Sequence, residues 1–340
     1  MSEQEINDEK LLKVDDLRTY FYTEEGVVPS VDGLSFELNK NETLAIVGES
    51  GCGKSVTSLS ILRLIANPGK IVTGSINYHG KDLVKASEKE MMKIRGKEIS
   101  MIFQEPMTSL NPVFTIGHQI YESLKYHEHA DKKTGYQKAV TLLQKVGIPD
   151  AEKVVHEYPH QLSGGMRQRV MIAMALACNP KILIADEPTT ALDVTIQAQI
   201  LNLLKELKKD MDTSIILITH DLGVVAQIAE NVMVMYAGEA VEKADVKTLY
   251  ANPLHPYTLG LLKSIPSLNE KKESLYNIPG MVPNPTEYAK GCRFAPRCEK
   301  CMERCLTEKP PLICMPDKHQ VRCWLYDGGD GNAETTAESE

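Results

Sequence analysis

The sequence predicts an α/β protein with a helical insertion and a separate cysteine-rich segment near its carboxy-terminus. Continuous apolar runs flanked by polar residues occur at 181–185 and 214–218, and such runs are typical of strands buried on both faces of a sheet. Further strands are expected at 43–47 and 99–103. Between about 107 and 180 the pattern is helical instead, which predicts a helical subdomain inserted into the α/β domain.

The same pattern suggests where the domains begin and end. We expect a flexible amino-terminus at 1–10 and the α/β domain at 11–264. From about 265 to 326 proline, cysteine and arginine become frequent and the periodicity disappears, so this segment is predicted to be a small irregular extension. The acidic, glycine-rich end at 327–340 is typical of a disordered tail.

Charge and hydropathy exclude several classes of function. The formal net charge of −8 argues against nucleic-acid binding, because neutralising phosphates demands clustered Lys and Arg. No apolar run approaches the roughly 20 residues that span a bilayer. The acidic start resembles neither a secretory signal nor a transit peptide. We therefore expect a soluble intracellular protein, whose role at a membrane would require a partner.

A phosphate-binding loop follows the first predicted strand of the α/β core. The segment GESGCGKS, from Gly48 to Ser55, matches the Walker A pattern G-x-x-x-x-G-K-[ST]. Its glycines let backbone N–H groups turn toward phosphates, Lys54 supplies a charge to the β- and γ-phosphates, and the Ser55 hydroxyl is a ligand for Mg²⁺. The predicted ATP-binding residues here are Gly48, Glu49, Ser50, Gly51, Cys52, Gly53, Lys54, Ser55 and Val56.

Two acidic residues end the predicted strand KILIA at 181–185. Asp186 can hold Mg²⁺ at the carboxyl end of the strand, where ligands bind in α/β sheets. Glu187 follows directly and is predicted to face the attacking water as a catalytic base. Beside a Walker A loop, this pair predicts ATP hydrolysis.

The segment LSGGMRQR, from Leu162 to Arg169, resembles the signature motif of ABC-type ATPases. The resemblance implies a P-loop ABC ATPase fold, in which a RecA-like mixed sheet and an antiparallel β part carry a helical subdomain and, here, the cysteine-rich extension. It also implies that the signature grips the ATP of a second subunit, because its residues open a helix whose N–H groups can hold a phosphate. Met166 stands where the family usually has Gln. The signature residues assigned to the partner's ATP are Ser163, Gly164, Gly165 and Met166.

Single residues match other family positions. Gln104 resembles the Q-loop glutamine, which contacts Mg²⁺ and the attacking water, and Asp193 resembles the D-loop aspartate. His220 resembles the switch histidine that orients the γ-phosphate. Either Phe21 or Tyr22 is expected to stack on adenine, with Phe21 favoured by spacing.

Two motifs after the core resemble the ATPases of oligopeptide, dipeptide and related nickel permeases. They are NPLHPYT at 252–258 and GCRFAPRC at 291–298, and the resemblance spans about 11–326. It implies a heterodimer with a paralogous ATPase, two integral-membrane permease subunits and an extracellular substrate-binding protein. It also implies a place at the cytoplasmic face of the membrane. Whether the substrate is a dipeptide, an oligopeptide or nickel stays open.

Six of the eight cysteines fall between 292 and 323. In a reducing compartment such a density indicates a metal or cluster rather than disulfides. Thiolates suit iron–sulfur clusters and zinc, and free thiols or disulfides are a third possibility. Family-like spacing implies a [4Fe–4S] cluster, with Zn²⁺ as the alternative. The implied ligands are Cys292, Cys298, Cys305 and Cys323, and the extra cysteines are Cys301 and Cys314.

Two other functional classes compete with transport. One is an ABC ATPase that acts on nucleic acid or ribosomes, but such chains usually carry two ATPase modules or a coiled coil, and this one is acidic with a single module. The other is a metal- or redox-handling protein in which ATP is regulatory. Co-purification with hydrophobic membrane subunits separates transport from both.

Overall fold

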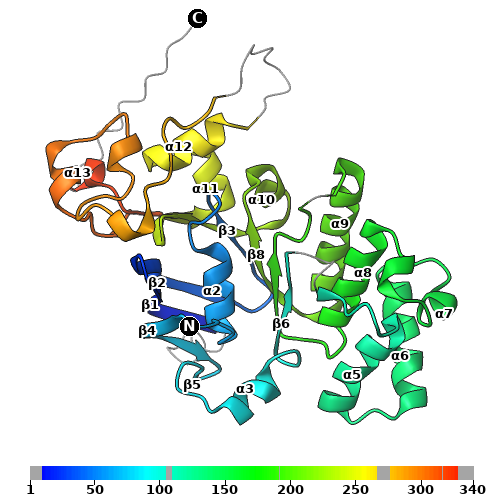
Figure 1. Cartoon of the computed structure of the whole chain (residues 1–340). Coiled ribbons are helices and arrows are strands. Elements are labelled where there is room, and N and C mark those ends of the chain that lie inside the picture. The colour runs from blue at the N-terminus through cyan, green and yellow to red at the C-terminus, as the bar shows by residue number, and fades with distance from the viewer. Residues whose placement is uncertain (1–9, 105–108, 191, 266–275, 316, 328–340) are drawn as a thin grey trace, which may run out of the picture.

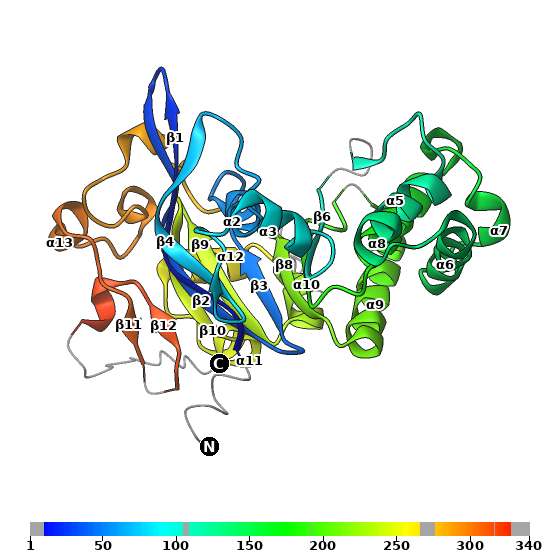
Figure 2. The ribbon, with the colours of Figure 1, turned by 90° about the horizontal axis from the view of Figure 1, so that it is seen from below.

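The computed structural model describes residues 10–104, 109–190, 192–265, 276–315 and 317–327. In these residues a central mixed sheet lies beside an antiparallel sheet, a helical lobe flanks one side, and the carboxy-terminal segment lies on the other side (Figures 1 and 2). No helix in this part of the chain is apolar over a length that could cross a bilayer.

The central sheet has the strand order β11-β12-β10-β9-β3-β8-β7-β6. Its parallel strands are β3 (Thr43–Val47), β6 (Ile99–Ile102), β7 (Ile182–Asp186), β8 (Ser214–Thr219) and β9 (Asn231–Tyr236). Every residue of β3, β7 and β8 is buried, as the continuous apolar runs of β7 and β8 predict. The mixed α/β fold that the sequence predicts is confirmed.

The second sheet is antiparallel, with the order β2-β1-β4-β5. Its strands are β1 (Lys10–Thr23), β2 (Gly26–Asn39), β4 (Gly69–Tyr78) and β5 (Lys81–Asp82). Buried and more exposed positions alternate along much of β1 and β2, which is typical of a sheet with one covered face. Its inward side chains, such as Leu17 and Leu34, share a core with Ile46 of β3 and Ile61 of α2 (Lys54–Ile61).

The helical lobe shares a second core with the other face of the central sheet. Its helices are α5 (Ile116–Glu128), α6 (Lys132–Lys145), α7 (Ala151–Val154) and α8 (Gly164–Ala175). They pack with α9 (Val194–Met211) and with the β7 and β8 side chains on that face, among them Leu183 and Leu217. Remaining helices of the α/β part include α3 (Glu88–Ile94), whose Ser87 forms a capping box with Glu90, and α10 (Leu222–Ile228).

The carboxy-terminal segment joins the central sheet. Its elements are β10 (Glu239–Asp245), α11 (Val246–Ala251), α12 (Pro256–Lys263), α13 (Glu303–Thr307), β11 (Ile313–Cys314) and β12 (Gln320–Val321). The short strand β12 pairs with β10, so the predicted extension lengthens the sheet. A two-residue strand is too short to give a periodic sequence signal. The predicted amino-terminal residues 1–9 and the tail 328–340 lie outside the described residues.

Candidate active site

The phosphate-binding loop connects β3 to α2 and is packed tightly against neighbouring strands. A Cβ atom at Gly48 would lie 2.2 Å from the Met235 carbonyl oxygen, and one at Gly53 would lie 2.1 Å from the Ser30 carbonyl oxygen. Gly53 also has a φ of 99°, in the left-handed region that favours glycine. Both glycines are therefore required by the packing of the loop as well as by its turn.

Lys54 is held inside this loop. Its Nζ donates hydrogen bonds to the carbonyl oxygens of Gly48 at 2.8 Å and Glu49 at 3.0 Å, and the residue is only 5% exposed. The ammonium is thus fixed by the loop itself, at the amino-terminal end of α2. A charge in that position, beside a helix N-terminus, is suited to an anion.

Asp186 is the last residue of β7, and its buried carboxylate has an oxygen that is free to bind a ligand. Its Oδ1 has no hydrogen-bond partner among the described residues. Burial raises the pKa of Asp186, and a hydrogen bond from the Ser55 hydroxyl opposes that rise. A carboxylate oxygen without a partner beside a hydroxyl fits Mg²⁺, which prefers oxygen ligands.

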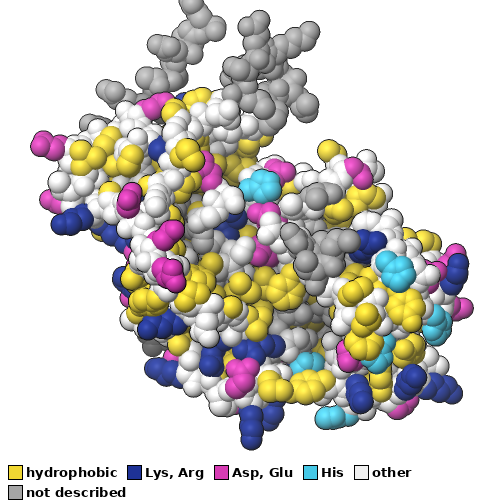
Figure 3. Space-filling model, viewed as in Figure 1, with side chains coloured by type: hydrophobic (Ala, Val, Ile, Leu, Met, Phe, Trp, Pro, Cys, Tyr) yellow, Lys and Arg dark blue, Asp and Glu magenta, His cyan; other side chains and the backbone are white. Residues whose placement is uncertain are grey.

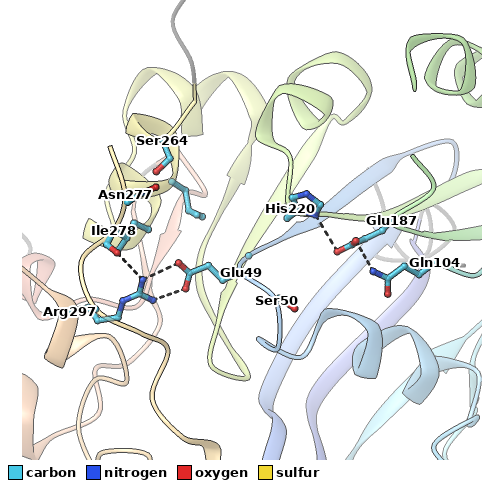
Figure 4. Close-up of a pocket in the computed structure, with 12 residues that line it drawn as sticks. Glu49, Ser50, Gln104, Glu187, His220, Ser264, Asn277, Ile278 and Arg297 are labelled. Atoms are coloured by element: carbon cyan, nitrogen blue, oxygen red, sulfur yellow. Dashed lines mark hydrogen bonds and ion pairs between the residues drawn. The ribbon is translucent and has the colours of Figure 1, made fainter. Parts of the chain in front are cut away.

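Glu187 contacts polar side chains from the loops that follow the parallel strands (Figure 4). Its Oε2 accepts hydrogen bonds from Gln104 Nε2 and Thr190 Oγ1, each at 2.9 Å, and its Oε1 lies 3.4 Å from His220 Nδ1. Burial alone would raise its pKa, but the contacts with Thr190 and His220 lower it below the ordinary value. Glu187 is therefore an ionised carboxylate at neutral pH, as a catalytic base requires.

These groups face one cavity of about 700 Å³. The phosphate-binding loop and the ends of the parallel strands contribute Gly48, Glu49, Ser50, Gln104, Glu187 and His220 to its lining. The carboxy-terminal segment contributes Leu261, Ser264, Asn277, Ile278, Gly280 and Arg297. Its volume is within the range of cavities that bind small molecules and cofactors. The sequence-predicted phosphate loop, Q-loop glutamine, base and switch histidine are thus brought together at the carboxyl ends of parallel strands.

The signature residues lie apart from that cavity, on the helical lobe (Figures 1 and 2). Ser163 caps α8 by accepting a hydrogen bond from the Met166 N–H, and both Ser163 and Gly164 are exposed. No atom would lie within 4 Å of a Cβ at Gly164. The amino-terminal end of α8 is therefore open to a second molecule. Met166 is partly buried against the core of the lobe, and Gly165 lies near Ile196 of α9.

The remaining predicted positions have separate local roles. Asp193 is exposed and caps α9, accepting a hydrogen bond from Ile196 N at 3.0 Å. Phe21 is half-buried against Gly69, whereas Tyr22 is 43% exposed with the Lys70 ammonium 4.5 Å from its ring centre. Neither aromatic ring is among the described residues that line the cavity, so the adenine contact stays a prediction.

The sequence was compared with family models, with curated proteins and with solved structures. The family model described as ABC transporter matches residues 31–190, and the model described as Oligopeptide/dipeptide transporter, C-terminal region, matches residues 241–305. The oligopeptide transport ATP-binding protein AppD of Bacillus subtilis is 58% identical over 318 residues, which cover 93% of this chain and 97% of AppD. This chain belongs to the oligopeptide/dipeptide family of ABC transporter ATP-binding subunits.

Other similar proteins support the same family assignment. OppD of Bacillus subtilis is 56% identical, covering 93% of this chain and 89% of OppD. The dipeptide transport protein DppD of Escherichia coli is 49% identical, covering 92% and 96% of the two chains. Among solved structures, the dimeric post-hydrolysis state of the ATP-binding cassette MJ0796 with ADP and phosphate matches with a TM-score of 0.63, 26% identity, and coverage of 69% and 98%. The chain is an ABC ATPase with the cassette fold.

Three contacts at the ABC ATPase site were not predicted from the sequence. Thr190 donates to Glu187, Tyr257 Oη accepts a hydrogen bond from Glu49 N at 2.8 Å, and Arg297 forms an ion pair with Glu49. Tyr257 and Arg297 belong to the two carboxy-terminal motifs of the family resemblance. The motifs mark both residues in the sequence, but they do not indicate that either one contacts the phosphate-binding loop.

The cysteines divide into two groups by position. The four implied ligands are buried or half-buried and line one small cavity with His255 and Trp324, whereas Cys301 and Cys314 are exposed. Burial raises the pKa of Cys292 to about 12 and that of Cys323 to about 11. Within the described ranges, no group of three or more His, Cys, Asp or Glu side chains is arranged to hold a metal ion. The four thiols share one cavity, and thiolates are the donors that soft metal centres use.

Proposed function

We propose that this chain supplies the energy for an importer of oligopeptides or dipeptides, as one of two paralogous ATPases beneath two permease subunits. The observation that carries the substrate class is the high identity to AppD, OppD and DppD over more than nine-tenths of the chain. The match to the oligopeptide/dipeptide carboxy-terminal region supports it further. The chain lies at the cytoplasmic face of the membrane, and an extracellular binding protein delivers the peptide.

The residues around the cavity have distinct roles in hydrolysis. Glu187 accepts the proton of a water molecule, whose oxygen attacks the γ-phosphorus while the bond from that phosphorus to the β–γ bridging oxygen breaks. ADP and phosphate result. Lys54 and the loop N–H groups hold the phosphates, and His220 orients the γ-phosphate. Ser55, Gln104 and Asp186 hold Mg²⁺, which supplies neutralisation of the phosphate charge.

A complete site requires two ATPase subunits. The exposed amino-terminal end of α8, with Ser163 and Gly164 at its tip, closes on the ATP held by the other subunit's phosphate loop, and Asp193 lies at the same interface. MJ0796, a cassette with a similar fold, is dimeric in its post-hydrolysis state. The isolated chain is therefore expected to be a poor ATPase.

Permease subunits contact the helical part of the chain near Gln104–Gln119. Phe103, Val113, Phe114 and Tyr158 are 42%, 70%, 40% and 39% exposed, and Figure 3 shows hydrophobic side chains on the surface of the helical lobe. The family resemblance implies a contact with the permease near Gln104–Gln119, of which residues 105–108 lie outside the described residues. Large apolar side chains that are exposed on this part of the chain support a protein interface there.

The cysteine cavity holds a [4Fe–4S] cluster bound by Cys292, Cys298, Cys305 and Cys323, with Zn²⁺ as the alternative occupant. Support comes from the shared cavity of the four thiols and from the exposure of Cys301 and Cys314. The segment around the cavity has a small apolar core of its own, so a bound centre would add cross-links. Its role is structural, because ATP hydrolysis includes no redox step.

Transport is tested by uptake of labelled dipeptides, oligopeptides and nickel in cells that lack this subunit. Peptide uptake should be lost and then restored by the wild-type gene, but not by a Glu187→Gln variant expressed at the same level. Loss of nickel uptake alone would contradict the peptide assignment. Unchanged uptake of all three substrates would contradict the import function itself.

A further inference from the structure

The phosphate-binding loop contains a negatively charged side chain, Glu49, that phosphate binding does not require. Glu49 is the second residue of the Walker A segment and lies on the wall of the cavity beside Gly48 and Ser50. A carboxylate there repels the phosphates of ATP. The loop is suited to ATP only if that charge is compensated.

The compensation comes from the opposite end of the chain. Arg297 lies 248 positions away, and its Nη1 and Nη2 donate to Glu49 Oε2 at 2.6 Å and Oε1 at 3.1 Å (Figure 4). This is a bidentate pair, in which geometry as well as charge favours the contact. The Arg297 side chain is only 5% exposed, whereas that of Glu49 is 28% exposed, so the carboxylate is the more open to solvent and salt of the two groups.

Arg297 is held in this position by neutral groups. Its Nε donates to the Pro279 carbonyl oxygen at 2.9 Å, and Nη2 donates to the Ile278 carbonyl oxygen at 3.3 Å. Nη1 lies 3.4 Å from Tyr236 Oη. The guanidinium has therefore only one carboxylate partner, Glu49, among these contacts. Its hydrogen bond with Glu49 is also the main cause that raises the pKa of Arg297 above its ordinary value.

The backbone of Glu49 is held by the same part of the chain. The N–H of Glu49 donates to Tyr257 Oη at 2.8 Å, and Tyr257 is fully buried. The Tyr257 ring is 4.7 Å from the Tyr236 ring and 5.4 Å from the Phe294 ring, measured between centres. Both the side chain and the backbone of Glu49 are thus fixed by residues outside the Walker A motif.

We propose that Arg297 is a positioning residue for ATP, which neutralises Glu49 and fixes the first half of the phosphate-binding loop. The carboxy-terminal segment then helps to set the affinity for ATP. Arg297 has no contact with Glu187 among its hydrogen bonds and ion pairs in the described residues. Its loss should therefore raise Kd and KM for ATP and leave kcat of the assembled transporter nearly unchanged.

The test is a double-mutant cycle on the full chain, read by equilibrium binding of a fluorescent ATP analogue with Mg²⁺. A unit charge about 8 Å from a phosphate, at an effective dielectric constant of about 30, changes a binding constant roughly tenfold. Arg297→Met should weaken binding by about that factor. Glu49→Gln should bind at least as tightly as the wild type, because it removes the repulsive charge. The double variant should return to within about threefold of the wild type.

A matched control comes from the same segment. Arg304 on α13 pairs with Glu308 at 2.8 Å and with Asp327 at 2.6 Å and lies over the Trp324 ring, so Arg304→Met removes a paired guanidinium away from the loop. The Arg304→Met variant should bind the analogue like the wild type.

Raising the salt concentration should reduce the difference in ATP affinity between Arg297→Met and the wild type, which loss of packing alone would not do.

Two results would overturn the proposal. One is wild-type affinity in a folded Arg297→Met variant, and the other is a double variant that binds as weakly as Arg297→Met. If thermal unfolding shows that Arg297→Met does not fold, the binding affinity of the Glu49→Gln variant tests the proposal instead. Weaker binding by Glu49→Gln than by the wild type would mean that the carboxylate helps ATP and that Arg297 is not its neutraliser.

Discussion

Replacing Glu187 by Gln tests the chemistry of the site most directly. The side chains have nearly the same shape, so the substitution removes the base and leaves the cavity intact. Removing a positioned base typically costs ~10²–10⁴-fold, and we expect turnover to fall at least ~100-fold. Nucleotide binding should be retained, because Lys54 and the loop are untouched. The variant should accumulate as an ATP-loaded dimer.

The local hydrogen bonds set the expected side effect on stability. Glu187 Oε2 accepts from both Gln104 and Thr190, and a Gln side chain offers one acceptor oxygen where the carboxylate has two. One hydrogen bond to the ionised carboxylate lost at this site costs about 1.5–3 kcal/mol of stability. Glu206→Gln, on the exposed face of α9, is a matched control that should change neither turnover nor stability.

The assay combines steady-state ATP hydrolysis by the assembled transporter with gel filtration in the presence of ATP and Mg²⁺. A pH series adds a check, because contacts lower the Glu187 pKa. The carboxylate should remain ionised as pH falls through the ordinary pKa of Glu, about 4.3. The stability it contributes is present above that value and is lost only as pH falls through the lower, folded-state pKa. Near-normal turnover in Glu187→Gln would refute its role as the base.

Three further predictions concern binding, assembly and the cysteines. Lys54→Ala should lose ATP affinity as well as turnover, measured by the same analogue binding, and wild-type affinity would contradict its role at the phosphates. The isolated chain should hydrolyse ATP slowly and gain activity when the paralogous ATPase and permease subunits are added; full activity in a dilute, demonstrably monomeric sample would refute this. Anaerobically purified protein should be brown, with about four iron and four sulfide per chain. The Cys301→Ser variant should keep the colour and the Cys305→Ser variant should lose it. Stoichiometric zinc without sulfide would refute the cluster and identify the occupant as Zn²⁺.

Much of the core, and the grouping of the candidate site residues around one cavity, was predictable from the sequence because the signals are local. Strands buried on both faces, such as β7 and β8, appear as unbroken apolar runs. The Walker A loop has a fixed spacing that follows from the geometry of phosphate binding. Glu187 and His220 each follow a buried strand, and the carboxyl ends of parallel strands meet at one edge of a sheet.

The contacts of the carboxy-terminal segment were not predictable in the same way. Arg297 and Glu49 are brought together by tertiary packing across 248 positions, and no local pattern records such a pair. The strand β12 has two residues and pairs with β10 where no periodicity could be detected. The choice between Phe21 and Tyr22 also depends on packing, because the two residues point to opposite faces of β1.

Besides their shared apolar core, the helical lobe and the sheet are connected by hydrogen bonds close to Glu187. Gln104 lies two residues after the end of β6, where the chain leaves the sheet for the helical lobe, and it supplies one of the two hydrogen bonds to Glu187 Oε2. A second link runs from α8, where the buried Gln168 Nε2 donates to the Pro188 carbonyl oxygen at 2.6 Å. The loop that contains Glu187 therefore accepts hydrogen bonds both from the start of the connection to the helical lobe and from the lobe itself. In the proposed dimer, the second subunit binds at the tip of α8 on that same lobe, so these two hydrogen bonds are the contacts to remove in a test of coupling between dimerisation and the position of Glu187.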